Sequence, residues 1–376
     1  MNGRRLWFVG IGGAGLSAYA QLARAWGAEV GGWDRNDTPY LEPLRDARIE
    51  ISPEPVVPDG WEAVVSSAYP AVPGMRRAEF LRELVSSRPS IVVGGTHGKG
   101  TTAAMIALGL VDAGKDPAWL IGAPVPQLGS NAGFGAGMLV VEGDESDRTV
   151  FSLPAEIAVV TNVELDHHTE FASLAELERE FDRWLATAKH VVRDAPPYSG
   201  PLALPGEHNR RNAGAAAAAL RLAGGTVESV ERFTGTGRRF EVHDRGDHVV
   251  VDDYGHHPTE VAVTIAAARE RFPGRRIVVA FQPHLYSRTR HLAGALAGAL
   301  AAADDVAVLD IYPARETPVP GVTGKLVVDA LSDLGVLAAW TPTLEEAAAH
   351  VARVRRAGDV VLVVGAGDID RLVGMV

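Results

Sequence analysis

The chain has 376 residues, of which 47% are hydrophobic, and its 36 basic and 47 acidic residues leave a net charge of −11. At roughly 100–200 residues per domain, this length predicts two or three domains with sizeable cores and excludes global disorder. The acidic balance argues against a general nucleic-acid binder. The absence of cysteine excludes disulfides, thiolate catalysis and Fe–S clusters, so any metal must be bound by oxygen or imidazole ligands.

The N-terminus and the lysine content lead to two further expectations. No apolar run reaches the roughly 18 residues of a membrane span, and the apolar stretch after Arg5 is interrupted by glycines, unlike a signal peptide. We therefore expect a soluble, cytoplasmic protein with no membrane insertion. Only four basic residues are lysines, which makes each of them worth checking for a specific role: Lys99, Lys115, Lys189 and Lys325.

Strand-length apolar runs alternate with helical segments along the whole chain, which is typical of parallel α/β domains. The first unit, expected over 1–88, contains strands at Leu6–Val9, Glu29–Trp33 and Trp61–Ser66 and helices at Leu16–Trp26 and Arg76–Ser87. The second, over 89–230, contains strands at Ile91–Val93, Met138–Val141 and Ile157–Val160 and helices at Thr101–Asp112, Ser173–Ala188 and His208–Ala223. The third, over 231–376, contains helices between strands at His248–Val251, Arg276–Phe281, Asp305–Ile311 and Asp359–Val364.

A glycine-rich turn joins the first strand to the first helix. Glycines let the backbone approach a pyrophosphate at a helix N-terminus, and an acid at the end of the next strand can bind a ribose hydroxyl. The pattern fits a dinucleotide or a nucleoside-diphosphate derivative and does not choose between NAD and UDP; a tight turn without a ligand is the alternative. The residues concerned are Gly10, Gly12, Gly13, Ala14, Gly15 and Asp34.

A second glycine-rich turn joins the strand at Ile91–Val93 to the next helix. Successive backbone N–H groups in such a turn form an anion nest, and Lys99 adds a positive charge for β- and γ-phosphates. The general P-loop spacing fails, because Val93 stands where a glycine is required and Gly100 where a serine or threonine is required. Thr101 is then the nearest hydroxyl for Mg²⁺. The turn comprises Gly94, Gly95, Thr96, His97, Gly98, Lys99, Gly100, Thr101 and Thr102.

Acidic and histidine residues follow two further strands of the second unit. Four carboxylates crowd the run from Glu142 to Asp147, where like charges repel one another unless a cation is present. His167 lies in the run that follows the strand at Ile157–Val160. Because parallel strands end at one edge of a sheet, Lys99, Glu142 and His167 are predicted to converge on one phosphate–Mg²⁺ site. A solvated acidic turn is the alternative for the first run.

Polar clusters also follow the later helices and strands. Paired histidines and clustered arginines suit the recognition of polyphosphate and carboxylate groups, although solvated loop charge is a fair alternative for any one of them. The clusters are those around Asn209, Arg239, Asp253, His256 and Arg288.

Taken together, these strings resemble the Mur ligases, the ATP-dependent amide-bond-forming enzymes of peptidoglycan precursor synthesis. They occur in the family's order across nearly the whole chain: FVGIGGAGLS, VVSSA, GGTHGKGTT, VEGDESD, TNVELDHH, PGEHNRRNA, GRRFE, DDYGHHPTE, FQPHLYSRTR and VVGAGDI. The resemblance implies an α/β fold of three domains: Rossmann-like at the N-terminus, P-loop ATPase-like in the centre and Rossmann-like at the C-terminus. DDYGHHPTE and FQPHLYSRTR are specific to the branch that uses UDP-N-acetylmuramate, L-alanine, ATP and Mg²⁺, through an acyl-phosphate intermediate.

The resemblance also implies roles for single residues. Lys99, Glu142, His167, His256 and Arg288 match catalytic positions, and Thr101, Glu142 and His167 match or replace metal ligands. The ATP-binding positions are the loop from Gly95 to Thr102 with Asn209, Arg239 and Asp253. The UDP-sugar positions are Gly10, Gly12, Gly13, Ala14, Gly15, Asp34, Ser66 and Ser67.

The chain departs from the family pattern at two places. Relatives carry a threonine directly after the loop lysine, where this chain has Gly100, and only 37 residues separate His168 from Gly206, where relatives usually insert a small β-subdomain. Lys189 is the only lysine near that stretch, and we assign it no role. The alternatives are a ligase that attaches a ready-made peptide to UDP-N-acetylmuramate, a nucleotide-sugar-binding pseudoenzyme and, on the first glycine motif alone, an NAD oxidoreductase.

Overall fold

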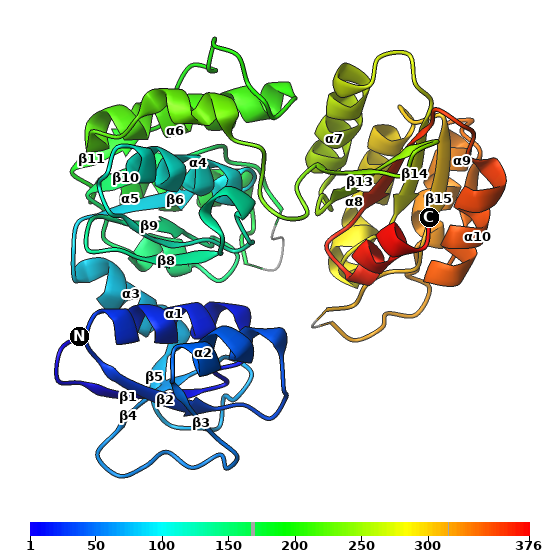
Figure 1. The fold of residues 1–376 in the computed structure, drawn as a ribbon. Helices are drawn as coiled ribbons and strands as arrows, with labels where there is room; N and C mark the ends of the chain where they lie inside the picture. Colours follow the sequence, from blue (N-terminus) through cyan, green and yellow to red (C-terminus); the bar gives the residue numbers. More distant parts are fainter. Residues whose placement is uncertain (167–169, 315) are drawn as a thin grey trace. The chain divides into compact units, whose positions relative to one another are not determined.

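The computed structural model describes residues 1–166, 170–314 and 316–376. The chain forms two compact units (Figure 1). One, called the first unit from here on, comprises Met1–Glu164, Ser173–Gly200 and Arg211–Phe233. The other, called the second unit from here on, comprises Leu165–Ala172, Pro201–Arg210 and Thr234–Val376. These two units differ from the three segments predicted from the sequence. Among the described residues, no helix combines the length and apolar character that crossing a bilayer requires.

The N-terminal sheet of the first unit has the strand order β3-β2-β1-β4-β5, and all its pairings are parallel. Its central strand β1 buries Leu6 to Val9 completely or nearly so, which is typical of a parallel strand covered on both faces. The strands are β1 (Arg5–Val9), β2 (Glu29–Trp33), β3 (Glu50–Ser52), β4 (Glu62–Val65) and β5 (Met75–Arg76), and the helices are α1 (Ala14–Ala25), α2 (Glu42–Asp46) and α3 (Arg77–Ser86).

The second sheet of the same unit has the order β11-β10-β6-β9-β7-β8, and only the β7–β8 pairing is antiparallel. The strands are β6 (Ser90–Gly94), β7 (Ala118–Leu120), β8 (Ala132–Phe134), β9 (Leu139–Glu142), β10 (Ile157–Val160) and β11 (His190–Val192). The helices are α4 (Lys99–Asp112), α5 (Leu174–Leu185) and α6 (Glu207–Ala223), and the first four residues of α6 belong to the other compact unit. Because β6, β9 and β10 are adjacent and parallel, the segments that follow them meet at one edge of the sheet.

A short connection runs from β11 towards α6, in the stretch where relatives were expected to insert a subdomain. Asp194 adopts a left-handed conformation with φ 54°. A Cβ at Gly214 of α6 would lie 2.1 Å from the carbonyl oxygen of Pro196, so the connection passes directly against the helix backbone. The Tyr198 hydroxyl donates a 2.6 Å hydrogen bond to Glu231. The middle of the connection, at Pro196 and Tyr198, is therefore packed against α6 and the segment around Glu231.

The sheet of the second unit has the order β12-β13-β17-β14-β15-β16, and only β12–β13 is antiparallel. Its central strands are buried and mostly apolar, and β13 ends on the buried pair Asp252–Asp253. The strands are β12 (Glu241–Asp244), β13 (Val249–Asp253), β14 (Ile277–Phe281), β15 (Asp305–Val308), β16 (Ala338–Trp340) and β17 (Val360–Val364). The helices are α7 (Pro258–Arg271), α8 (Tyr286–Leu300), α9 (Lys325–Asp333) and α10 (Leu344–Val354).

The structure confirms the α/β class and three parallel-rich sheets, one in each predicted segment. The boundaries at 88 and 230 stay a prediction. Some strands are shorter than predicted. The largest difference is at Asp305–Ile311, which ends at Val308 because the Asp310 carboxylate accepts hydrogen bonds from the Ile311 and Gly324 amides and turns the chain.

Candidate active site

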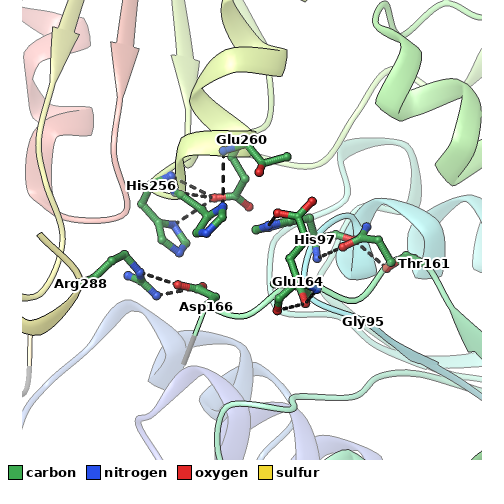
Figure 2. A network of polar contacts seen from close by, with 12 residues as sticks. Gly95, His97, Thr161, Glu164, Asp166, His256, Glu260 and Arg288 are labelled. Atoms are coloured by element: carbon green, nitrogen blue, oxygen red, sulfur yellow. Dashed lines mark hydrogen bonds and ion pairs between the residues drawn. The ribbon is translucent and has the colours of Figure 1, made fainter. Parts of the chain in front are cut away.

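The loop between β6 and α4 is held by the residues that follow the neighbouring strand β10. The Thr96 and His97 amides donate to the backbone oxygen and the side-chain oxygen of Asn162, at 3.0 and 2.9 Å. The Thr161 hydroxyl donates to the His97 carbonyl at 2.6 Å (Figure 2). Gly95 has φ +123°, and a Cβ there would lie 2.2 Å from the Thr161 Oγ1. Glycine is therefore required in this loop both for its backbone conformation and for the close approach of Thr161.

Lys99 begins α4 and lies at the carboxyl edge of the second sheet. Its ammonium contacts the carboxylate of Glu145 at 2.8 Å and donates to the carbonyls of Gly95 and Thr96 at 2.8 and 3.1 Å. Burial lowers the pKa of Lys99, but the surrounding charges, Glu145 first, outweigh it and leave this pKa above its ordinary value. The lysine is therefore a protonated cation at the start of the helix.

Glu142 ends β9 and lies between two glycines. Its carboxylate accepts a 2.6 Å hydrogen bond from the Gly122 amide. A Cβ at Gly100 would lie 3.1 Å from one carboxylate oxygen of Glu142 and 3.4 Å from the other. The position directly after Lys99 is thus the one that faces Glu142, as a P-loop hydroxyl would. Thr101 is buried, and the hydroxyl of Thr102 is buried with no hydrogen-bond partner among the described residues.

The first glycine turn forms its own compact arrangement at the end of β1. The Gly12 amide donates to the Asp34 carboxylate at 2.9 Å. Gly10 has φ +89°, and a Cβ there would lie 2.7 Å from the Cβ of Ser66. The structure therefore brings Asp34 and Ser66 to the turn, with the exposed Ser67 directly after. The remaining predicted residues of the turn also belong to it, at the entry to α1: Gly13, Ala14 and Gly15.

Arg77 lies beside the same helix N-terminus and was not predicted from the sequence. A Cβ at Gly15 would lie 3.4 Å from the Nε of Arg77. A guanidinium next to the positive end of a helix strengthens the attraction for an anion there. The only available signal was the Arg76–Arg77 pair, which was read as an ordinary helix start.

In the second unit, Asp253 ends β13 and is enclosed by hydrogen-bond donors. It accepts from the amides of Phe240 and Gly255 at 2.9 and 2.8 Å and from the Thr264 hydroxyl at 3.0 Å. Burial raises the pKa of its carboxyl group. Asp253 therefore fixes the loop that carries Arg239, whose guanidinium lies 5.2 Å from the ring centroid of Tyr254.

Asn209 and Arg239 also take up definite positions within the second unit. Asn209 is buried, and its side-chain amide donates to the Pro205 carbonyl at 2.7 Å. Arg239 lies 3.3 Å from the carboxylate of Glu260 in α7. Both are held by protein groups near the start of a helix.

His256 and Arg288 belong to a largely buried polar cluster in the second unit (Figure 2). Arg288 makes a two-pronged ion pair with Asp166, at 2.7 and 3.0 Å, and both side chains are 5% exposed. Its Nη1 lies 3.0 Å from the Nδ1 of His284, whose ring centroid is 5.6 Å from that of His256. Burial, with the nearby Arg288, lowers the pKa of His256 to about 4, so its imidazole is neutral at pH 7.

The predicted residues thus form separate groups. Lys99, Glu142 and Thr101 lie at the strand ends of the second sheet, and Arg239, Asp253, His256 and Arg288 lie in the other compact unit. His167 lies outside the described residues. Three acidic residues form ion pairs with the predicted residues Lys99, Arg288 and Arg239. They lie inside the motifs that resemble the Mur ligases, but the sequence analysis gave them no individual role: Glu145, Asp166 and Glu260.

Comparison with known proteins gives consistent results. Residues 238–367 match the family model described as Mur ligase, glutamate ligase domain. The UDP-N-acetylmuramate–L-alanine ligase of Paenarthrobacter aurescens is 36% identical over 437 residues, covering 97% of this chain and 94% of that protein. The enzyme of the same name from Kineococcus radiotolerans is 37% identical over 442 residues, with the same coverage. Both aligned lengths exceed the 376 residues of this chain, so these relatives contain residues that it lacks.

Among solved structures, this one is similar to UDP-N-acetylmuramate–alanine ligase MurC from Thermotoga maritima, with a TM-score of 0.78, 28% identity and 98% of each chain covered. A murein peptide ligase from Psychrobacter arcticus has a TM-score of 0.65 at 22% identity, a likeness of fold alone. Identity above one third over almost the whole chain means that this protein belongs to the Mur ligase family.

Proposed function

We propose that the protein uses ATP to join L-alanine to UDP-N-acetylmuramate. The observation that carries this proposal is the identity of 36% and 37%, over 97% of the chain, with enzymes of that name. The position of Lys99 supports it independently, because a buried cation at a strand–loop–helix anion nest is what a transferring phosphoryl group needs.

In the first step, a carboxylate oxygen of the muramate attacks the γ-phosphorus of ATP. The bond from that phosphorus to the bridging oxygen breaks, ADP leaves, and an acyl phosphate remains. Lys99 and the loop amides from Gly95 to Thr102 offset the negative charge that spreads over the transferring group. Asn209, Arg239 and Asp253 are the residues of the second unit that we propose for ATP binding.

The donors at the end of β9 suit Mg²⁺, which prefers oxygen ligands. Glu142 supplies a carboxylate beside the helix start, and we propose that it holds the metal with Thr101 and His167. When bound, Mg²⁺ neutralises part of the charge on the phosphoryl oxygens.

In the second step, the amine of L-alanine attacks the acyl carbon, the bond from that carbon to the phosphate oxygen breaks, phosphate leaves, and the nitrogen loses a proton to solvent. A base with a pKa of about 4 removes protons poorly at neutral pH, so His256 is better suited to accept a hydrogen bond that orients the amine. Arg288 presents a guanidinium in the same cluster, which suits the carboxylate of the amino acid. We propose these two residues for the alanine and muramate groups.

We propose that the nucleotide-sugar binds at the first glycine turn. The amides at the start of α1 and the guanidinium of Arg77 offer positive charge to a diphosphate, and Asp34, Ser66 and Ser67 lie at the strand ends beside it. Because Asp34 already accepts from the Gly12 amide, it shapes the turn as well as offering a second carboxylate oxygen.

The test is phosphate release with ATP, Mg²⁺, UDP-N-acetylmuramate and one acceptor at a time: L-alanine, glycine, L-serine, or the tripeptide L-alanyl-γ-D-glutamyl-meso-diaminopimelate. We expect release that depends on the sugar nucleotide and is fastest with L-alanine. Fastest release with the tripeptide would instead assign the chain to the peptide-attaching ligases. No release with any acceptor, in protein that binds the sugar nucleotide, would identify a pseudoenzyme.

A further inference from the structure

We propose that Glu145 is a positioning residue that binds the ammonium of Lys99 in the nucleotide-free protein and releases it when a nucleotide phosphate binds. This inference rests on the proposed function, because it assumes that the loop between β6 and α4 binds ATP. It adds a residue that neither the motif spacing nor the assigned metal ligands include.

The contacts of Lys99 are the first argument. The Lys99 ammonium donates hydrogen bonds to the carbonyls of Gly95 and Thr96 at 2.8 and 3.1 Å and forms an ion pair with the Glu145 carboxylate at 2.8 Å. A phosphate oxygen that pairs with Lys99 must therefore compete with the Glu145 carboxylate for the same positive charge. Nucleotide binding is thus an exchange of partners.

The fixed position of Glu145 is the second argument. The residue is only 1% exposed, and backbone hydrogen bonds hold its segment to strand β6 and within its own turn. The Gly143 amide donates to the Val93 carbonyl at 2.9 Å, and the Arg148 amide donates to the Glu145 carbonyl at 3.0 Å. A Cβ at Gly143 would lie 2.6 Å from a methyl group of Val150, so the turn has no room to shift. The flexible lysine side chain is therefore the partner that moves.

Charge determines the direction of the effect. In the nucleotide-free protein the Glu145 carboxylate attracts the ammonium, and in the nucleotide-bound protein the same buried carboxylate repels the phosphates. Both effects weaken nucleotide binding, so removing the charge while keeping the shape should strengthen it. We expect Glu145→Gln to lower the Kd for ADP by about tenfold, which corresponds to about 1.4 kcal/mol.

The experiment measures ADP binding to the full chain by titration calorimetry without Mg²⁺, for the wild type and Glu145→Gln. The matched control is Glu156→Gln, which removes the charge of Glu156 from its pair with Lys189 (2.6 Å), whose ammonium-bearing side chain is 65% exposed. We expect tighter ADP binding for Glu145→Gln and an unchanged Kd for the control. A purely structural role predicts equal or weaker binding in Glu145→Gln, and that result would overturn the proposal. If the wild type binds no ADP, the proposed function itself fails.

A second measurement tests the exchange in the wild type, and so does not depend on the folding of a variant. Because the chain has only four lysines, selective ¹³C labelling of their ε-carbons gives a spectrum in which Lys99 is assigned by its loss in Lys99→Ala. We expect ADP to shift the Lys99 signal and to leave that of Lys189 in place. An unmoved Lys99 signal at saturating ADP would show that the ammonium keeps its partners, and the proposed role of Glu145 would be wrong.

Discussion

Placing a side chain at Gly100 should displace Glu142, the carboxylate proposed to hold Mg²⁺. A Cβ alone would lie 3.1 Å from one carboxylate oxygen of Glu142, already tight, and the two methyl groups of a valine extend further. The carboxylate must then turn away and lose its 2.6 Å hydrogen bond from the Gly122 amide. A hydrogen bond to a charged group contributes about 1.5–3 kcal/mol. If that loss appears in the reaction rate, Gly100→Val slows phosphate release about 10- to 100-fold.

The assay is the Mg²⁺ dependence of ATP-dependent phosphate release, together with a thermal unfolding curve. The matched control is Gly298→Val in α8, because a Cβ at that helical glycine meets nothing within 4 Å. Gly100→Thr has nearly the shape of valine but carries a hydroxyl, so any activity that it recovers over Gly100→Val measures what an oxygen at this position contributes. Thr101→Val removes the oxygen proposed to replace it and should raise the Mg²⁺ requirement. Turnover of Gly100→Val within twofold of both the wild type and the control would refute this account of Glu142.

Three further predictions follow from the charges of the described residues. Lys99→Ala should lower phosphate release about 100-fold or more without changing the circular dichroism spectrum, and near-normal turnover in a folded variant would remove Lys99 from the site. Arg288→Ala should impair alanine use more than ATP affinity, and equal losses of the two would count against the placement of Arg288 near the amino acid. The variant also leaves the buried Asp166 carboxylate unpaired, which costs about 3–5 kcal/mol, so adding Asp166→Asn should recover part of the lost thermal stability. Burial raises the pKa of Asp252 from 3.8 to about 6, so the folded protein retains a proton that the unfolded chain has lost, and stability falls as pH rises from about 4 to 6. In urea unfolding, the wild type should therefore lose up to about 3 kcal/mol relative to Asp252→Asn across this range, and parallel pH profiles would contradict the shift.

The sequence predicted the sheets well because buried parallel strands are continuous apolar runs, as in Ile91–Val93 and Val360–Val364. The proposed phosphate residues Lys99 and Glu142 follow such runs, so the strand-end rule placed them at one edge of the second sheet. The pairing of Lys99 with Glu145 was beyond that rule. Every acid of the run after Glu142 satisfies the same charge argument, and the fold of the turn decides which one reaches the lysine.

Long-range pairs were unpredictable for a different reason. Arg288 and Asp166 are separated by 122 residues, and nothing in either string specifies the other as its partner. The close approach of Glu142 to Gly100 was missed because the sequence shows only that position 100 has no side chain. Only the structure shows what fills the space that the side chain would have taken.

The packed connection between β11 and α6 has a practical consequence for protein engineering. The Asp194 side chain is 93% exposed and its backbone leaves the edge strand in a left-handed turn, which is typical of sites that tolerate inserted sequence. The contacts that hold the connection, at Pro196 and Tyr198, come after this turn. A fluorescent or affinity module inserted between Asp194 and Ala195 would therefore leave those contacts and the strand ends around Lys99 intact, and would give the protein a reporter remote in sequence from its glycine-rich loops.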